Sequence, residues 1–234
     1  MQYILQIDPK RIHDPNRDRY IQSKGHVVEA LYIVLSEMGY FDPQLLDTYL
    51  GFGSDFIGHV TKKVPSIEQS TGSLGHGLSL GAGMALSGLL NSQSYRVFVL
   101  LGDGEMTEGS VWEAALFSAH YKLRNLIAVV DRNRLQITDT TDLLMKTEPL
   151  ADKFTSFGWH VVEIDGQDMI QLKTSLRSPP FHKNKPTAII MNTIKGSGIS
   201  IMENDIIWNH KVPTDEKYNL AVEEIEIKIQ LMGV

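Results

Sequence analysis

Three short runs of β-branched and aliphatic residues place the strongest constraint on the fold of this chain. They occupy residues 96–101, 126–130 and 187–191, and residues 159–164 form a weaker fourth run. Hydrophobicity in these runs is continuous rather than alternating, which is typical of parallel strands that helices cover on both faces. The runs therefore predict buried strands of a parallel sheet.

Segments with helical spacing separate the runs. Residues 27–38, 78–90 and 111–123 carry apolar residues three and four positions apart, and a glycine or serine lies close to the start of each. This alternation predicts an α/β fold with a doubly wound, mainly parallel sheet and helices on both faces. Ligands of such folds bind beyond the carboxyl ends of the strands, so we expect the chemistry just after Leu101 and Val130.

Composition excludes several classes of protein. The chain has 234 residues, 42% of them hydrophobic and 21% charged, which is enough to bury a substantial core, and we predict a single domain over residues 1–234. A net charge of −6 without a basic run argues against binding to nucleic acid or to an anionic membrane.

Near the C-terminus, residues 225–231 alternate like a strand but contain the Glu and Lys typical of a helix, so both structures stay open.

Cysteine usage and the N-terminus bear on the compartment. The chain has no cysteine, which excludes disulfides, thiolate metal sites and a cysteine nucleophile and agrees with a reducing compartment. The N-terminus lacks the apolar core of a signal peptide, and no apolar stretch is long enough for a membrane helix. We expect a soluble, cytoplasmic protein.

Two polar loops follow the predicted strands. The sequence GDGE comes directly after the first run, and Asn133 lies shortly after the second. Carboxylate, amide and backbone carbonyl oxygens are the ligands that Mg²⁺ or Ca²⁺ prefers, and glycines let the backbone approach a phosphate closely. A lone GDG is typical of a tight turn. Here, however, 30 residues separate Asp103 from Asn133, enough for one helix and one strand, so both loops should border the same crevice.

GDG followed about thirty residues later by Asn resembles the signature of thiamine-diphosphate enzymes, and GDGEMTEGSVWEAA together with DRNRLQ is similar to the transketolase family in particular. The resemblance implies that Asp103, Asn133 and the backbone carbonyl of Leu135 hold Mg²⁺, or alternatively Ca²⁺ or Mn²⁺, against the cofactor diphosphate. It also places Ile137 near the thiazolium ring. The rest of the GDGE loop joins the implied cofactor-binding residues: Gly102, Gly104 and Glu105.

Other stretches resemble the same family. SKGH ends at His26, which the resemblance places at the cofactor diphosphate, and GH ends at His59, which it places toward the substrate. Both are predicted catalytic groups. In TGSLGHG, the carbonyl of Gly72 would accept a hydrogen bond from the cofactor's amino group, and Leu74 would pack on its pyrimidine ring. In WNHK, His210 is a further catalytic candidate, although the register there leaves Asn209 as the alternative match.

Two acidic residues and the extent of the resemblance indicate partner chains. Glu108 and Glu113 lie at a predicted helix start, where the helix dipole alone favours acids; in transketolases such glutamates link two distant active sites. The resemblance covers residues 1–215 but only the first of the family's three domains, and the family's opening GHPG segment has no counterpart. We expect the pyrimidine-binding and C-terminal domains on a second subunit, in an α2β2 heterotetramer.

The resemblance implies an enzyme that transfers a two-carbon ketol unit between sugar phosphates or related polyols. This chain would be the N-terminal, diphosphate-binding subunit of a split transketolase, active only with its partner. A 1-deoxyxylulose-5-phosphate synthase or the α-subunit of a 2-oxo acid dehydrogenase would share the GDG and the Asn. A noncatalytic regulatory or assembly subunit that retains the fold is the remaining alternative.

Overall fold

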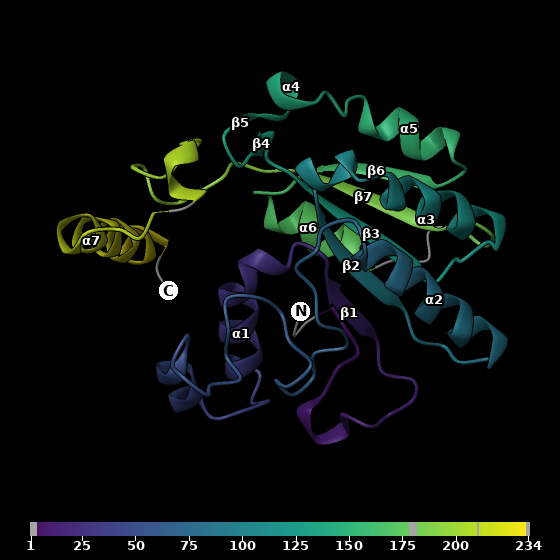
Figure 1. Ribbon diagram of the computed structural model, residues 1–234, viewed down its shortest axis with the longest axis horizontal. Coiled ribbons are helices and arrows are strands. Elements are labelled where there is room, and N and C mark those ends of the chain that lie inside the picture. Colours follow the sequence, from purple (N-terminus) through teal and green to yellow (C-terminus); the bar gives the residue numbers. More distant parts are fainter. Residues whose placement is uncertain (1–3, 178–181, 210, 233–234) are drawn as a thin grey trace.

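A five-stranded sheet forms the centre of the protein (Figure 1). The computed structural model describes residues 4–177, 182–209 and 211–232. All neighbouring strands of the sheet run parallel, in the order β1-β2-β3-β7-β6. Their bounds are β1 Arg19–Gln22, β2 Val97–Gly102, β3 Leu126–Arg132, β6 His160–Asp165 and β7 Thr187–Asn192. The predicted parallel α/β sheet is confirmed, as are its four predicted strands.

Alternate residues of β2 point to opposite faces of the sheet, and helices cover both faces. Val97, Val99 and Leu101 are fully buried in a core with α2 (Gly77–Leu90), α3 (Gly109–His120) and α5 (Leu150–Ser156). Phe98 and Leu100 pack on the other side, together with Leu172 and Leu176 of α6 (Met169–Arg177). Because neither face of β2 meets water, its hydrophobicity is continuous.

Strand β1 was not predicted from the sequence. It has four residues, begins with a charged Arg19 and lies at the edge of the sheet, where it pairs with β2. Its length is too short for a periodic pattern. Long-range contacts fix it instead: the preceding Asp18 is 1% exposed and pairs with Arg96 at 2.6 Å between Oδ2 and Nη2.

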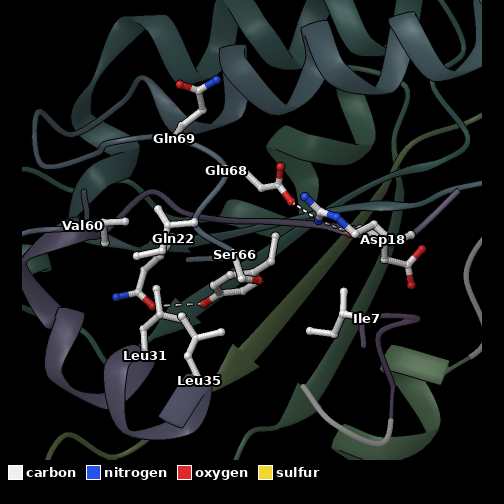
Figure 2. A pocket seen from close by; sticks show the side chains of 12 residues that line it. Ile7, Asp18, Gln22, Leu31, Leu35, Val60, Ser66, Glu68 and Gln69 are labelled. Atoms are coloured by element: carbon white, nitrogen blue, oxygen red, sulfur yellow. Dashed lines mark hydrogen bonds and ion pairs between the residues drawn. The ribbon is translucent and has the colours of Figure 1, made fainter. Parts of the chain in front are cut away.

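A small cavity lies where β1 meets α1 (Val28–Glu37), and Figure 2 shows the side chains around it. Arg17 forms an ion pair with Glu68 there, and the Tyr20 hydroxyl donates to Gln22 Oε1 at 3.2 Å. The cavity measures about 20 Å³, which is room for about one water molecule. We therefore regard it as a packing feature of the fold.

The C-terminal segment is helical. α7 spans Asp215–Met232 and extends away from the sheet, at the left in Figure 1. Glu224 and Lys228 are one helical turn apart, with 2.8 Å between Oε1 and Nζ, and Glu224 also accepts hydrogen bonds from Ser200. Helix-forming residues thus prevail over the alternating pattern there.

No helix among the described residues is both long and apolar enough to cross a membrane.

The remaining elements are short and connect those above. They are η1 (Pro9–Arg11), η2 (Gly25–Val27), η3 (Pro43–Thr48), η4 (Gly104–Thr107), η5 (Ile206–Asn209), α4 (Thr141–Leu144) and the two-stranded hairpin of β4 (Leu135–Gln136) and β5 (Asp139–Thr140).

Candidate functional site

A cavity of about 380 Å³ opens where the chain leaves the carboxyl ends of β1, β2, β3 and β7. Parallel strands bring these ends to one edge of the sheet, as the sequence predicted. Nine predicted site residues line the cavity: His26, Leu74, Gly102, Asp103, Gly104, Glu105, Asn133, Leu135 and Ile137. Lys24, Val27, Glu29, Gln136, Lys195, Trp208 and Asn209 complete the lining.

Asp103 and Asn133 lie on neighbouring loops that hydrogen bonds hold together. Asp103 Oδ2 accepts from the Arg134 amide at 2.6 Å, and Asp103 Oδ1 accepts from the Gly104 amide at 2.9 Å. Asn133 Oδ1 accepts from the Leu135 amide at 2.9 Å. The backbone of Arg134 turns sharply, with φ at 61°. The loop that carries Asn133 is thus folded back onto the end of β2.

The oxygen-rich surroundings of Asp103 suit a cation. Burial raises the pKa of Asp103 to about 6, and its backbone hydrogen bonds only partly oppose that effect. In addition, Gln136 Oε1 is a buried acceptor without a hydrogen-bond partner in the described part of the chain. The described residues contain no group of three or more His, Asp or Glu arranged as a metal site. One carboxylate and one amide instead fit an ion that takes its other ligands from a bound anion, water and backbone.

Two lysines and a histidine also line the cavity: Lys24, Lys195 and His26. Lys24 Nζ lies 2.6 Å from Asp131 Oδ2, while Lys195 follows the end of β7. Burial lowers the pKa of Lys195, and the neighbouring Lys24 charge lowers it further. Burial also lowers the pKa of His26, again together with nearby positive charges. A bound anion would relieve this repulsion. Lys195 was not predicted from the sequence, although its place after a strand end is the same signal that identified Asp103.

His59 lies against the glycine turn rather than in the cavity lining. A Cβ on Gly72, whose φ is +153°, would lie 2.7 Å from His59 Cδ2, so glycine is needed for the ring to approach. Leu74 of the same turn lines the cavity. The structure thus brings His59 and the turn together, with the His59 side chain exposed.

The remaining candidates lie at the periphery. Glu108 and Glu113 are exposed at the start of α3 and do not line the cavity. His210 lies outside the described residues. Its neighbour Asn209 does line the cavity, where Asn209 Nδ2 donates to the Ile137 carbonyl at 3.1 Å. That contact ties the segment after β7 to the loop after β3.

Comparison with known proteins shows which family the chain resembles over most of its length. The family described as "Transketolase, thiamine diphosphate binding domain" matches residues 1–216. A protein of Phocaeicola vulgatus, named as a subunit of apulose-4-phosphate transketolase, is 45% identical over 227 residues, covering 97% of this chain and 81% of that protein. "6-deoxy-6-sulfo-D-fructose transketolase subunit SqwG" of Clostridium sp. is 38% identical over 95% of this chain and 82% of that protein.

Solved structures give the same result. A Pichia stipitis transketolase in complex with sedoheptulose-7-phosphate is 28% identical, with a TM-score of 0.80 over 97% of this chain and 39% of that one. Campylobacter jejuni transketolase is 25% identical, with a TM-score of 0.80 over 97% of this chain and 41% of that one. The chain belongs to the transketolase family and matches its thiamine diphosphate binding domain.

Proposed function

We propose that this chain is the diphosphate-binding subunit of a split transketolase, a transferase that moves a two-carbon ketol unit between sugar phosphates. The observation that supports this proposal best is the cavity itself. Its lining brings the buried Asp103 carboxylate and Asn133 together with Lys195 and the imidazole of His26. That arrangement suits a diphosphate bridged by a divalent cation.

The metal ligands in this proposal are the side chains of Asp103 and Asn133 and the carbonyl of Leu135, and Mg²⁺ is the expected ion, with Ca²⁺ or Mn²⁺ as alternatives. All three are hard oxygen donors, and all three residues line the cavity. The pKa of Asp103, raised to about 6 by burial, supports the assignment because a bound cation would stabilise its carboxylate.

The cofactor-binding residues follow from the same cavity. His26 and the Gly104 backbone would contact the diphosphate of thiamine diphosphate, and Ile137 would pack beside the thiazolium ring. At the other end, Gly72 would accept from the amino group and Leu74 would pack on the pyrimidine. Gly102 and Glu105, the other two residues predicted to bind the cofactor, also line the cavity, but the Glu105 carboxylate accepts hydrogen bonds from the chain itself.

Bound thiamine diphosphate supplies the carbanion chemistry of two-carbon transfer. This chain's residues orient the reactants and exchange protons or hydrogen bonds with them. His26 faces the cavity, while His59 is exposed beside the turn of Gly72, where an incoming substrate can reach it. His210 stays a further candidate for this role.

A partner subunit completes the proposal. The similar proteins of Phocaeicola vulgatus and Clostridium sp. are both named as subunits of a transketolase. We propose that a second chain bears the pyrimidine-binding and C-terminal domains, in an α2β2 heterotetramer. Glu108, which immediately precedes α3, and Glu113 on α3 are both exposed; they would face another chain and connect the active sites.

The test is calorimetry of thiamine diphosphate with this chain and its partner, with and without Mg²⁺. We expect binding that depends on Mg²⁺, together with ketol transfer between sugar phosphates by the same mixture. Binding without transfer would favour a noncatalytic subunit that retains the fold, and absence of Mg²⁺-dependent binding would contradict the proposal.

A further inference from the structure

Glu105 is the most deeply buried acid at the edge of the cavity. Its side chain is 2% exposed, at the start of η4 just after β2. Glu105 Oε1 accepts from the Ser23 hydroxyl and from the Gly75 amide, the latter at 2.7 Å, and Glu105 Oε2 accepts from the Gly102 amide at 3.2 Å. Both carboxylate oxygens are thus engaged by donors of the protein itself.

The donors come from three segments that are separate in the sequence. Ser23 lies 82 residues from Glu105, just after β1, and Gly75 lies 30 residues away in the glycine turn. Gly102 is the last residue of β2. Each of these segments carries a residue of the proposed cofactor site: His26 after β1, Gly72 and Leu74 in the turn, and Asp103 after β2. One carboxylate therefore joins three walls of the cavity.

Further bonds extend this contact around the turn. Ser23 Oγ also accepts from the Gly77 amide at 3.2 Å, and Ser110 Oγ donates to the Gly75 carbonyl at 2.9 Å. The packing is close, since a Cβ on Gly77 would lie 2.3 Å from Ser23 Oγ. A turn held at both its N–H and C=O groups has little freedom to rearrange.

Burial of a carboxylate is costly unless hydrogen bonds compensate for it, and hydrogen bonds to a charged acceptor are stronger than neutral ones. Three donors at Glu105 provide that compensation. A carboxylate so fully engaged has little capacity left for the cofactor and would repel a diphosphate at short range. Its geometry suits a structural contact rather than a ligand.

We propose that Glu105 is a positioning residue that shapes the cofactor-binding walls before the cofactor arrives, by holding Ser23, Gly75 and Gly102 in one hydrogen-bonded cluster. The inference rests on the proposed function for what the walls bind, but the cluster itself is a property of the free chain. Preorganisation of this kind strengthens binding because the ordering of the loops precedes association.

The test is amide hydrogen exchange of the full chain without cofactor, resolved at Gly75 and Gly102. Glu105→Ala removes both acceptor oxygens, so exchange at both amides should become at least about tenfold faster. Glu105→Gln keeps one acceptor oxygen and removes the other, so at least one of the two amides should become faster. Glu163→Gln is the matched control, because Glu163 is exposed on β6 and its exchange pattern should equal that of the wild type.

A second variant keeps the test decisive if Glu105→Ala does not fold. Ser23→Ala removes the hydroxyl that joins Glu105 to Gly77 and should speed exchange at the Gly77 amide, with a smaller effect at Gly102. Wild-type exchange at Gly75 and Gly102 in folded Glu105→Gln would overturn the inference.

Cofactor binding separates this inference from the proposed function. With partner and Mg²⁺ present, Glu105→Gln should weaken thiamine diphosphate binding by about tenfold, in parallel with faster exchange. Weaker binding with unchanged exchange would instead make Glu105 a direct ligand and contradict the positioning role. Failure of the wild type to bind the cofactor would contradict the proposed function. The exchange measurement on the free chain would still test the Glu105 cluster independently.

Discussion

Asp103 at the end of β2 accepts a hydrogen bond from the Arg134 amide at 2.6 Å, across 31 residues of sequence. This contact folds the loop after β3 toward the loop after β2 and places Asn133 on the same cavity as Asp103. The carboxylate stabilises the loop, and in the proposed function it would also supply a charged oxygen to the metal ion.

The first prediction concerns Asp103→Asn, which keeps the shape of the side chain but removes its charge. We expect loss of Mg²⁺-dependent thiamine diphosphate binding by more than about 100-fold, since changes even to residues behind a metal ligand cost about 10–100-fold. Calorimetry with partner present measures the effect. Asp47→Asn, at an exposed position in η3, is the matched control and should bind normally. Unchanged affinity in Asp103→Asn would remove Asp103 from the metal site.

The second prediction concerns His59, which lies beside Gly72 but does not line the cavity. His59→Ala should lower kcat/KM by on the order of 100-fold while thiamine diphosphate affinity stays close to wild type. Steady-state kinetics and calorimetry of the same preparation separate the two quantities. If affinity collapses while the rate per bound cofactor stays normal, His59 serves the cofactor rather than the substrate.

The third prediction concerns pH and His26. Burial, together with nearby positive charge, lowers the pKa of His26 below its ordinary value. As the pH falls through about 6.5, the unfolded chain therefore takes up a proton before the folded chain does, and folding loses stability. An NMR titration of the free chain should give His26 a midpoint below about 6.5. In His26→Asn this component of acid destabilisation should vanish, and a midpoint at or above the ordinary value contradicts the prediction.

The fourth prediction compares two glycines of α2. A Cβ on Gly81 would lie 2.5 Å from Val99 Cγ2, whereas a Cβ on Gly83 would meet nothing within 4 Å. Gly81→Ala should lower the free energy of unfolding by about 1–3 kcal/mol through overpacking. Gly83→Ala should raise it by about 0.5–1 kcal/mol, because alanine favours helix. Urea unfolding of both variants checks this, and equal effects would mean that α2 does not pack on β2 as described.

The sequence predicted the parts of the fold in which local pattern and tertiary environment agree. Strands β2, β3 and β7 are buried on both faces, so they form continuous hydrophobic runs from which the strands could be predicted. The facing loops of Asp103 and Asn133 followed from the spacing of a βαβ unit alone. The edge strand β1 could not be predicted from the sequence, because its four residues include the charged Arg19 and owe their extended conformation to pairing with β2.

The finer structure of the site depends on contacts between residues far apart in the sequence. Lys24 pairs with Asp131 over 107 residues, and Glu105 binds Ser23 over 82 residues. No local pattern encodes such partners. The family resemblance predicted Glu105 as a cofactor-binding residue. Only the structure shows that its carboxylate accepts hydrogen bonds from Ser23, Gly75 and Gly102.

The last prediction is that the isolated chain is inactive and that activity appears on mixing with the partner subunit. Thiamine diphosphate would be held at its diphosphate by Asp103 and Asn133 in the proposed function and would still need its pyrimidine end enclosed. This chain does not bury two apolar residues of the cavity lining, Leu74 and Ile137, and Ile137 is 57% exposed. A ketol-transfer assay with cofactor and Mg²⁺, run before and after the partner is added, measures the effect.

A mass measurement of the same mixture should give two copies of each chain, because two active sites between chains imply closed two-fold symmetry. The control is a mixture with partner and Asp103→Asn, which should assemble but stay inactive, since Asp103 lies in a cavity rather than on an exposed helix face. Full activity from this chain alone would refute the split-enzyme proposal. It would require a complete active site within these residues, and the pyrimidine end would then have to be enclosed by a second copy of the chain.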